Sequence, residues 1–138
     1  MIIEWSAPDW HGSAILSYRI EVRSQSGDFY EEYSYCDGSL SAVVSSRQCT
    51  IPLLTLQAPP FYLTLGDSVF ASVTASNVYG ESNASPIGNG AIIVEVPDAP
   101  VSLADNVQYT SDTVIALTWN NGISQGGATI IDYKITYD

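Results

Sequence analysis

The stretch at residues 69–80, VFASVTASNVYG, constrains the fold more than any other part of the chain. Every second position from Val69 to Ala75 is apolar, and the positions between them are mostly polar. An alternation of period two puts one set of side chains on each face of a β-strand. The alternation stops at residues 76–77 and Gly80 follows, which predicts a turn. We therefore expect a central strand with one buried face.

The rest of the chain contains short apolar or alternating stretches separated by turn residues. No stretch longer than ten residues has helical periodicity. Pro52 interrupts one of the expected strands and makes it an edge strand. Many short strands between turns predict an all-β sandwich or barrel. The expected strands are 2–5, 14–23, 29–35, 40–44, 47–56, 61–65, 91–96, 101–103, 113–119 and 130–137.

Composition limits the classes of function. The chain has 138 residues, enough for one domain or a little more, and 46% of them are hydrophobic. Its net charge of -11 argues against nucleic acid and anionic membrane surfaces, because both are bound by Lys and Arg. No run is long or apolar enough to suggest a signal peptide or membrane insertion. No Ser/His/Asp order, phosphate loop or metal cluster is present, so we expect no enzymatic activity, cofactor or metal site.

The chain has two cysteines, Cys36 and Cys49. A single pair in an acidic chain rich in Ser and Thr suggests a disulfide and an oxidising, extracellular compartment. The bridge would stabilise the short segment that it closes by about 3 kcal/mol. Two reduced buried thiols are the alternative. A redox-sensing role is less favoured, because there is no C-x-x-C motif or basic neighbour.

The two ends of the chain match each other. IIEW, ending at Trp5, aligns with ALTW, ending at Trp119, and GSAILSYRI, around Tyr18, aligns with GATIIDYKI, around Tyr133. The offset is 114 at the Trp and 115 at the Tyr. We therefore expect one complete repeat and a duplicated overlap.

A proline-rich segment, Pro97-Asp98-Ala99-Pro100, separates the two copies and predicts a domain boundary. The first domain, 1–96, would lack its first strand, and the second, 97–138, would hold only its first three strands. Either the chain is part of a longer tandem array, or partial domains complete one another between molecules by strand addition.

Several of these motifs resemble the fibronectin type III family. PDAP at 97–100 is similar to its proline-rich first strand, and the tripeptides ending at Trp5 and Trp119 are similar to its second strand. Residues 15–22 and 130–137 resemble the third strand with its inward Tyr. The sixth strand and its exit turn resemble 69–80 with the following Glu-Ser. The resemblance implies an immunoglobulin-like β-sandwich.

The resemblance also implies a set of core residues, and the chain departs from the family pattern in two places. The family usually has a Tyr where this chain has Val69, so its corner hydrogen bond should be absent, and residues 28–48 carry an insertion. This cysteine-bearing insertion and the run PFYLTLGD resemble repeats in large surface proteins of ciliate-type protists. The core residues implied are Trp5, Tyr18, Val73, Ala75, Trp119 and Tyr133.

Other candidate sites are few. Asn83-Ala84-Ser85 is an N-glycosylation sequon in a predicted loop. His11, the only histidine, has no partner at ligand spacing and is expected to be a solvated loop residue, and Trp10 beside it suits either an interface, a sugar or its own domain. The carboxylates are too scattered for a calcium loop. They include Asp9, Asp28, Glu31, Glu32, Asp98 and Asp105.

These observations favour a non-enzymatic structural or adhesive repeat of an extracellular tandem-domain protein that forms a rod or filament. Its expected partners are copies of itself or adjacent repeats, and glycans. One alternative is a ligand-binding module of a cell-surface receptor or adhesin that uses residues 8–13 and 81–89. Another is a spacer in a large carbohydrate-active enzyme.

Overall fold

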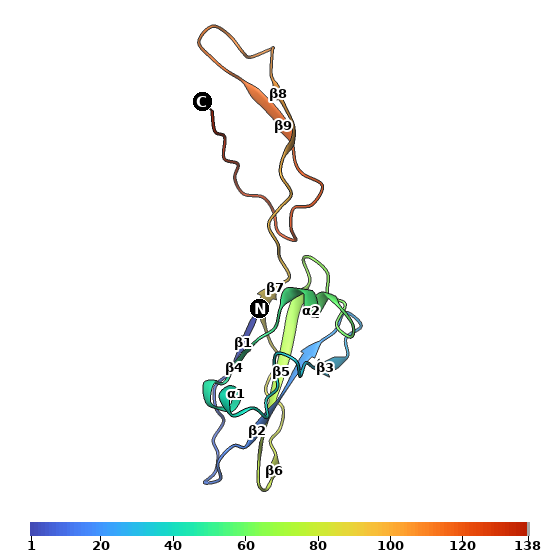
Figure 1. The fold of residues 1–138 in the computed structure, drawn as a ribbon, viewed down its shortest axis with the longest axis vertical. Helices are drawn as coiled ribbons and strands as arrows, with labels where there is room; N and C mark the ends of the chain where they lie inside the picture. The colour runs from blue at the N-terminus through green and yellow to red at the C-terminus, as the bar shows by residue number, and fades with distance from the viewer. Residues whose placement is uncertain (138) are drawn as a thin grey trace. The chain divides into compact units, whose positions relative to one another are not determined.

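A computed structural model describes residues 1–137, except for the side chain of Asn89. The chain divides into two compact units, an N-terminal unit of Met1–Ile93 and a C-terminal unit of Val94–Asp138. The sequence predicts this boundary three residues later, between 96 and 97. Figure 1 shows the elements, which are mostly antiparallel strands with two short helices. They are β1 (Ile2–Glu4), β2 (Ser17–Arg23), β3 (Phe29–Glu31), α1 (Ser41–Ser46), β4 (Gln48–Thr50), α2 (Leu53–Gln57), β5 (Ser68–Asn77), β6 (Gly80–Glu81), β7 (Gly88–Ile92), β8 (Val101–Asp105) and β9 (Leu117–Asn120).

The larger sheet of the N-terminal unit is organised around β5. This ten-residue strand pairs with β2 on one edge and with β6 and β7 on the other, and β3 continues the sheet beyond β2. The β2–β5 register runs from Ser17 opposite Ser76 to Val22 opposite Ala71. The predicted central strand is therefore present, and every pairing in this sheet is antiparallel.

A smaller sheet of two strands, β1 and β4, lies across the core from β5, with Ile3 opposite Cys49. Alternate residues of β2 face this core and are buried, as the period-two pattern predicts. The most deeply buried apolar side chains come from β2, from α2 and from the segments that follow β4, α2 and β7. They are Phe61, Ile20, Ile51, Leu56, Ile93 and Val22.

One predicted strand is a helix instead, and another is a strand only in its first part. Residues 40–44 were expected to be extended, but α1 covers Ser41–Ser46, and it places Val43 and Val44 against the core. The strand expected over 47–56 ends after Thr50, and α2 follows Pro52 directly. Proline lacks an N–H and suits the start of a helix, so it ends the strand and begins α2. Helices of six and five residues are too short to reveal their period in the sequence.

Other predicted strands differ in extent or are absent. Of 29–35, only Phe29–Glu31 is a strand, because the Glu32 carboxylate accepts hydrogen bonds from the Ser34 and Tyr35 N–H groups and closes a turn. In the described part of the chain, residues 61–65 join no sheet. The strand expected at 91–96 is β7, which begins at Gly88 and ends at Ile92.

The C-terminal unit contains the antiparallel pair β8–β9, and its residues 130–137 join no sheet in the described chain. The β8–β9 register shifts between Val101 and Ala104, where Ser102 has a φ of 59°. The N–H groups of Glu95 and Asp98 donate to the carbonyl oxygens of Gly126 and Ser124. Gly126 is the only buried residue among the described positions of this unit, so its apolar side chains are largely exposed.

Candidate functional site

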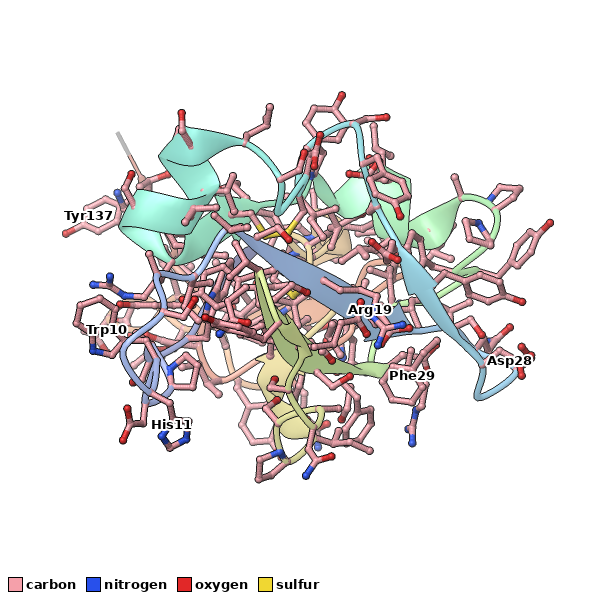
Figure 2. The ribbon with its side chains drawn as sticks, turned by 90° about the horizontal axis from the view of Figure 1, so that it is seen from below. Trp10, His11, Arg19, Asp28, Phe29 and Tyr137 are labelled. Atoms are coloured by element: carbon pink, nitrogen blue, oxygen red, sulfur yellow. A yellow bond between two sulfur atoms is a disulfide. The ribbon has the colours of Figure 1, made fainter. Side chains whose placement is uncertain are left out.

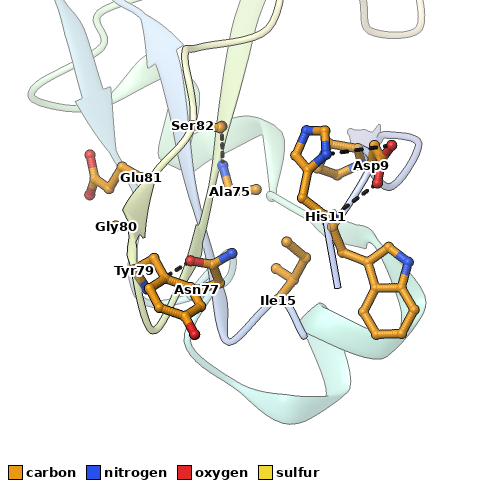
Figure 3. A pocket seen from close by; sticks show the side chains of 11 residues that line it. Asp9, His11, Ile15, Ala75, Asn77, Tyr79, Gly80, Glu81 and Ser82 are labelled. Atoms are coloured by element: carbon orange, nitrogen blue, oxygen red, sulfur yellow. Dashed lines mark hydrogen bonds and ion pairs between the residues drawn. The ribbon is translucent and has the colours of Figure 1, made fainter. Parts of the chain in front are cut away.

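The loop before β2 and the turn between β5 and β6 meet at one end of the N-terminal unit. Together they line a pocket of about 240 Å³, shown in Figure 3. Residues 8–11 form one wall, Tyr79 to Ser82 form the other, and Ile15 and Ala75 lie between them. Parts of the two segments predicted as a contact surface, 8–13 and 81–89, therefore lie together.

Short-range hydrogen bonds shape both walls of this pocket. The His11 N–H donates to Asp9 Oδ1 at 2.8 Å, and the Tyr79 N–H donates to Asn77 Oδ1 at 2.9 Å. His11 has a φ of 48°, in the left-handed region, and Gly12 continues this at 80°. Aspartate and asparagine form such turns readily because their side chains reach the backbone two residues on.

The chemistry of this pocket suits contact better than catalysis. Trp10 is 57% exposed and Tyr79 is 89% exposed, and Figure 2 shows Trp10 and His11 at the periphery. The His11 side chain approaches Asp9 at 3.7 Å, but both side chains are largely in solvent, where such a pair contributes little. Exposed aromatic rings with polar neighbours can stack on sugars or bury against protein.

A second, larger groove of about 560 Å³ lies between β1 and β7 in the same unit. Its walls include Ile2, Glu4 and Ala91, and core residues Trp5 and Val73 contribute to its lining. The indole N–H of Trp5 is buried and has no hydrogen-bond partner in the part of the chain that the structure describes. The groove therefore has both polar and apolar walls and lies between β1 and β7.

The predicted disulfide is present and joins Cys36 to Cys49. Cys36 follows the turn after β3, and Cys49 is the central residue of β4, so the bridge joins the segment after β3 to the smaller sheet. Both cysteines are buried in the core. An intramolecular disulfide indicates an oxidising environment. None of the described helices is both long and apolar enough to cross a membrane.

The predicted core residues form the same contact in both units. Trp5 packs edge-on against Tyr18 with ring centroids 5.2 Å apart and an interplanar angle of 69°. Trp119 packs against Tyr133 at 5.4 Å and 64°. Tyr18 and Ala75 are buried, and Trp5 and Val73 pack against the same core while partly accessible. Trp119 and Tyr133 are only half-buried, because the C-terminal unit has no buried apolar side chain among its described residues.

The sequon Asn83-Ala84-Ser85 lies between β6 and β7, and Asn83 is exposed. No pattern in the sequence indicates the structural role of Ser82 and Ser85 beside the sequon. Their hydroxyl groups accept hydrogen bonds from the N–H groups of Ala75 and Val73. These side chains thus replace strand partners along β5 between β6 and β7.

Other local interactions were also not predicted. Asp67 Oδ2 accepts hydrogen bonds from the N–H and hydroxyl of Thr64, and these bonds lower the pKa of Asp67. Bonds from the hydroxyl and N–H of Ser39 likewise lower the pKa of Asp37. The described residues contain no group of three or more His, Cys, Asp or Glu side chains that could hold a metal ion.

On the outer face of the larger sheet, the Arg23 guanidinium lies 3.9 Å from the centre of the Phe70 ring. Arg19 pairs with Glu81 at 3.3 Å. Neither contact has a sequence motif. The only indication of this outer face in the sequence is the alternation along β2, which places Arg19 and Arg23 on the same side.

Comparison with known proteins adds no family to these observations. No protein-family model matches the chain, and a search of curated proteins finds none with significant similarity. The function must therefore be argued from the residues and the geometry alone.

Proposed function

We propose that this chain is a non-enzymatic structural or adhesive repeat of fibronectin type III-like fold, from an extracellular tandem-domain protein that forms rods or filaments. The observation that carries the proposal is the recurrence of one Trp–Tyr contact in two units, at centroid distances of 5.2 and 5.4 Å. A repeated sequence with repeated packing is typical of tandem arrays.

The strand order supports the fold assignment within this proposal. If β1 is the second strand of an immunoglobulin-like sandwich, then β2, β4 and β5 are its third, fifth and sixth strands. Such sandwiches place the second and fifth strands in one sheet and the third, sixth and seventh in the other. The pairings β1–β4 and β2–β5–β7 have this arrangement.

The disulfide and the exposed sequon agree with an extracellular location. Mass spectrometry of peptides from the native protein should find a glycan on Asn83. An Asn83 that is unmodified in every native peptide would argue against passage through a glycosylating secretory route.

Electron microscopy of the native, full-length material tests the proposal directly. We expect extended particles with a regular repeat, because tandem sandwiches joined by proline-rich linkers stack end to end. Compact particles with no extended array would contradict the proposal.

A second candidate is a ligand-binding module of a receptor or adhesin, favoured by the pocket between residues 8–11 and 79–82. Its exposed Trp10 and Tyr79 suit a glycan or a protein loop. A glycan array probed with the protein should then give signals that fall in a Trp10→Ala variant. Equal signals from both proteins would argue against this candidate.

A further inference from the structure

One edge of β1 has no strand partner among the described residues. The Met1 N–H and C=O groups exchange hydrogen bonds with Ile51 at 2.7 and 2.8 Å, and the Trp5 N–H donates to Arg47 O at 3.1 Å. Antiparallel pairing alternates along a strand, so odd-numbered residues of β1 face β4. The backbone groups of Ile2 and Glu4 therefore point toward the opposite edge, which borders the groove.

The C-terminal unit shows what pairs with the matching strand. β9 repeats the sequence of β1 at an offset of 114, so Ala116 corresponds to Ile2 and Thr118 corresponds to Glu4. The Asn106 N–H donates to Ala116 O at 2.7 Å, and Ala104 lies opposite Thr118 in the β8–β9 register. β9 thus uses for β8 the same edge that β1 leaves open.

We propose that β8 of a second copy of this chain adds to the open edge of β1, antiparallel to it. In the register of β8–β9, Ala104 would lie opposite Glu4, and Asp105 would lie opposite Ile3. Backbone hydrogen bonds supply the attraction in strand addition, and side chains in the groove supply specificity. This inference rests on the proposed function as a self-associating repeat and assigns the surface and the segment that join two copies.

Burial favours the second copy as the occupant. Leu103 is 68% exposed and Val101 is 49% exposed where β8 pairs with β9. Leu103 and Trp119 line the same shallow pocket of the C-terminal unit, and Trp5, the counterpart of Trp119, lines the groove. In the groove, Leu103 would also meet core residues of β5, so the exchange buries apolar surface that β9 leaves in water.

The structural correspondence between the two units ends in the loop that follows β1 in one unit and β9 in the other. This limits the length of the segment that can dock. A Cβ atom at Gly126 would lie 2.2 Å from Glu95 O. When the alignment of GSAILSYRI with GATIIDYKI is extended back by one residue, the counterpart of Gly126 is His11, which has a side chain. Glu95 of a docked second copy therefore cannot approach His11 as closely as Glu95 approaches Gly126 within the C-terminal unit. The docked segment is β8 itself.

The contact joins two different surfaces, one groove and one β8 on each copy. Such heterologous contacts form rings when they close and filaments when they do not. Because the chain has a net charge of -11, added salt should strengthen the association by screening repulsion between copies.

Sedimentation velocity of the full chain over a range of concentrations tests the proposal. We expect concentration-dependent association. Glu4→Pro, which removes an N–H from the open edge, should weaken this association about ten-fold or more. Thr50→Pro is the matched control, because Thr50 lies opposite Ile2 and directs its N–H to the outer edge of β4. Circular dichroism establishes that both variants fold.

A second pair of variants tests the incoming strand. Leu103→Asp should weaken association at least ten-fold, because it replaces the apolar side chain of β8 that docking would bury with a charged one. Leu54→Asp is its control, since Leu54 is 77% exposed on α2 and does not line the groove. Equal association of Glu4→Pro and the unmodified chain would overturn the proposal, as would a chain that stays monomeric at every concentration.

A synthetic peptide of residues 99–106 measures binding at the open edge of β1 without the free-energy cost of detaching β8 from β9. It should bind the full chain and compete with self-association, but should not bind Glu4→Pro. Peptide binding without self-association would overturn the second copy as the occupant. Extended arrays in native material without any β8 exchange would sink this inference and leave the proposed function standing. Compact native particles whose β8 exchange depends on Glu4 would contradict the proposed function and leave this inference standing.

Discussion

Gly38 holds a position that no other residue type fits. Its carbonyl oxygen accepts a hydrogen bond from the Tyr18 N–H at 2.9 Å, so the segment after β3 runs closely beside β2. A Cβ atom at residue 38 would lie 1.8 Å from Tyr18 O and 2.7 Å from the Ile20 side chain. The requirement for glycine here comes from contact with the backbone of β2.

Gly38→Ala should therefore lower the free energy of unfolding by about 3 kcal/mol, the upper range for overpacking. Urea denaturation followed by circular dichroism measures the change. Gly88→Ala is the matched control, because its nearest contact would be at 3.8 Å, and it should change stability little. A Gly38→Ala protein as stable as Gly88→Ala would show that the segment beside β2 moves freely.

Ser85 has two separable roles, as a hydrogen-bond acceptor for β5 and as the third residue of the sequon. Ser85→Ala leaves the Val73 N–H without its acceptor, so unglycosylated protein should lose about 1 kcal/mol of stability. Ser85→Thr keeps the hydroxyl group and the sequon and should lose less. Thermal unfolding of the two variants side by side distinguishes these effects. Equal losses of stability would show that the Ser85 hydroxyl group does not stabilise the fold.

Among the elements, β4 is joined to the segment after β3 by a covalent bond as well as by packing. Cys36 and Cys49 are 13 positions apart in the sequence, and α1 lies in the loop that they close. Reduction should lower the free energy of unfolding by about 3 kcal/mol, because the unfolded chain regains the freedom of that loop. Urea denaturation with and without dithiothreitol measures this.

The Cys36→Ala/Cys49→Ala double variant provides the control for reduction. Its stability should be low and should not respond to dithiothreitol. If dithiothreitol shifted the midpoint of the double variant as much as that of the unmodified protein, the effect would not come from the disulfide.

Two turns tie their carboxylates to neighbouring donors and make stability depend on pH. The folded pKa values of Asp37 and Asp67 lie below the ordinary value, so each group stabilises the fold at a pH above that value. This contribution should be lost as pH falls below about 4, where aspartate in the unfolded chain takes up protons. Thermal midpoints between pH 6 and 2 should decline less steeply in Asp67→Asn, and an unchanged slope would contradict the assignment.

Strands with alternating apolar and polar side chains could be predicted from the sequence. Elements whose conformation depends on packing against the rest of the fold could not. The alternation in β2 and β5 is visible because each strand presents apolar side chains to the core and polar side chains on its other face, although Ser72 and Thr74 of β5 are also buried. The helices α1 and α2 are short, and their apolar residues have no period of their own, so tertiary packing decides their conformation. The pocket and the groove could not be predicted, because each joins segments distant in sequence, such as residues 8–11 and 79–82.

Across the whole chain, the two units differ in how much they bury. The N-terminal unit has a core of buried residues from both of its sheets, whereas Gly126 is the only buried residue among those described after Val94. Local stability follows the number of buried apolar contacts. We therefore expect the two units to unfold separately.

Hydrogen exchange of the monomeric chain at low concentration should show this difference. Amides in β2 and β5 should exchange slowly, near the rate set by global unfolding, and those in β8 and β9 should exchange much faster. Addition of protein to concentrations at which copies associate should slow exchange in β1 as well. Equal protection of β5 and β9 in the monomer would contradict separate unfolding.

The bridge between Cys36 and Cys49 has a mechanical consequence for a protein loaded along its length. Pulling on the chain can extend only the residues outside the closed loop, and 13 residue intervals bridged by a Cα–Cα distance of 5.1 Å are withheld. Their contour length is about 40 Å at the extension of a stretched polypeptide. The N-terminal unit would therefore lengthen less under force in its oxidised form, so the redox state of its surroundings would set its extensibility.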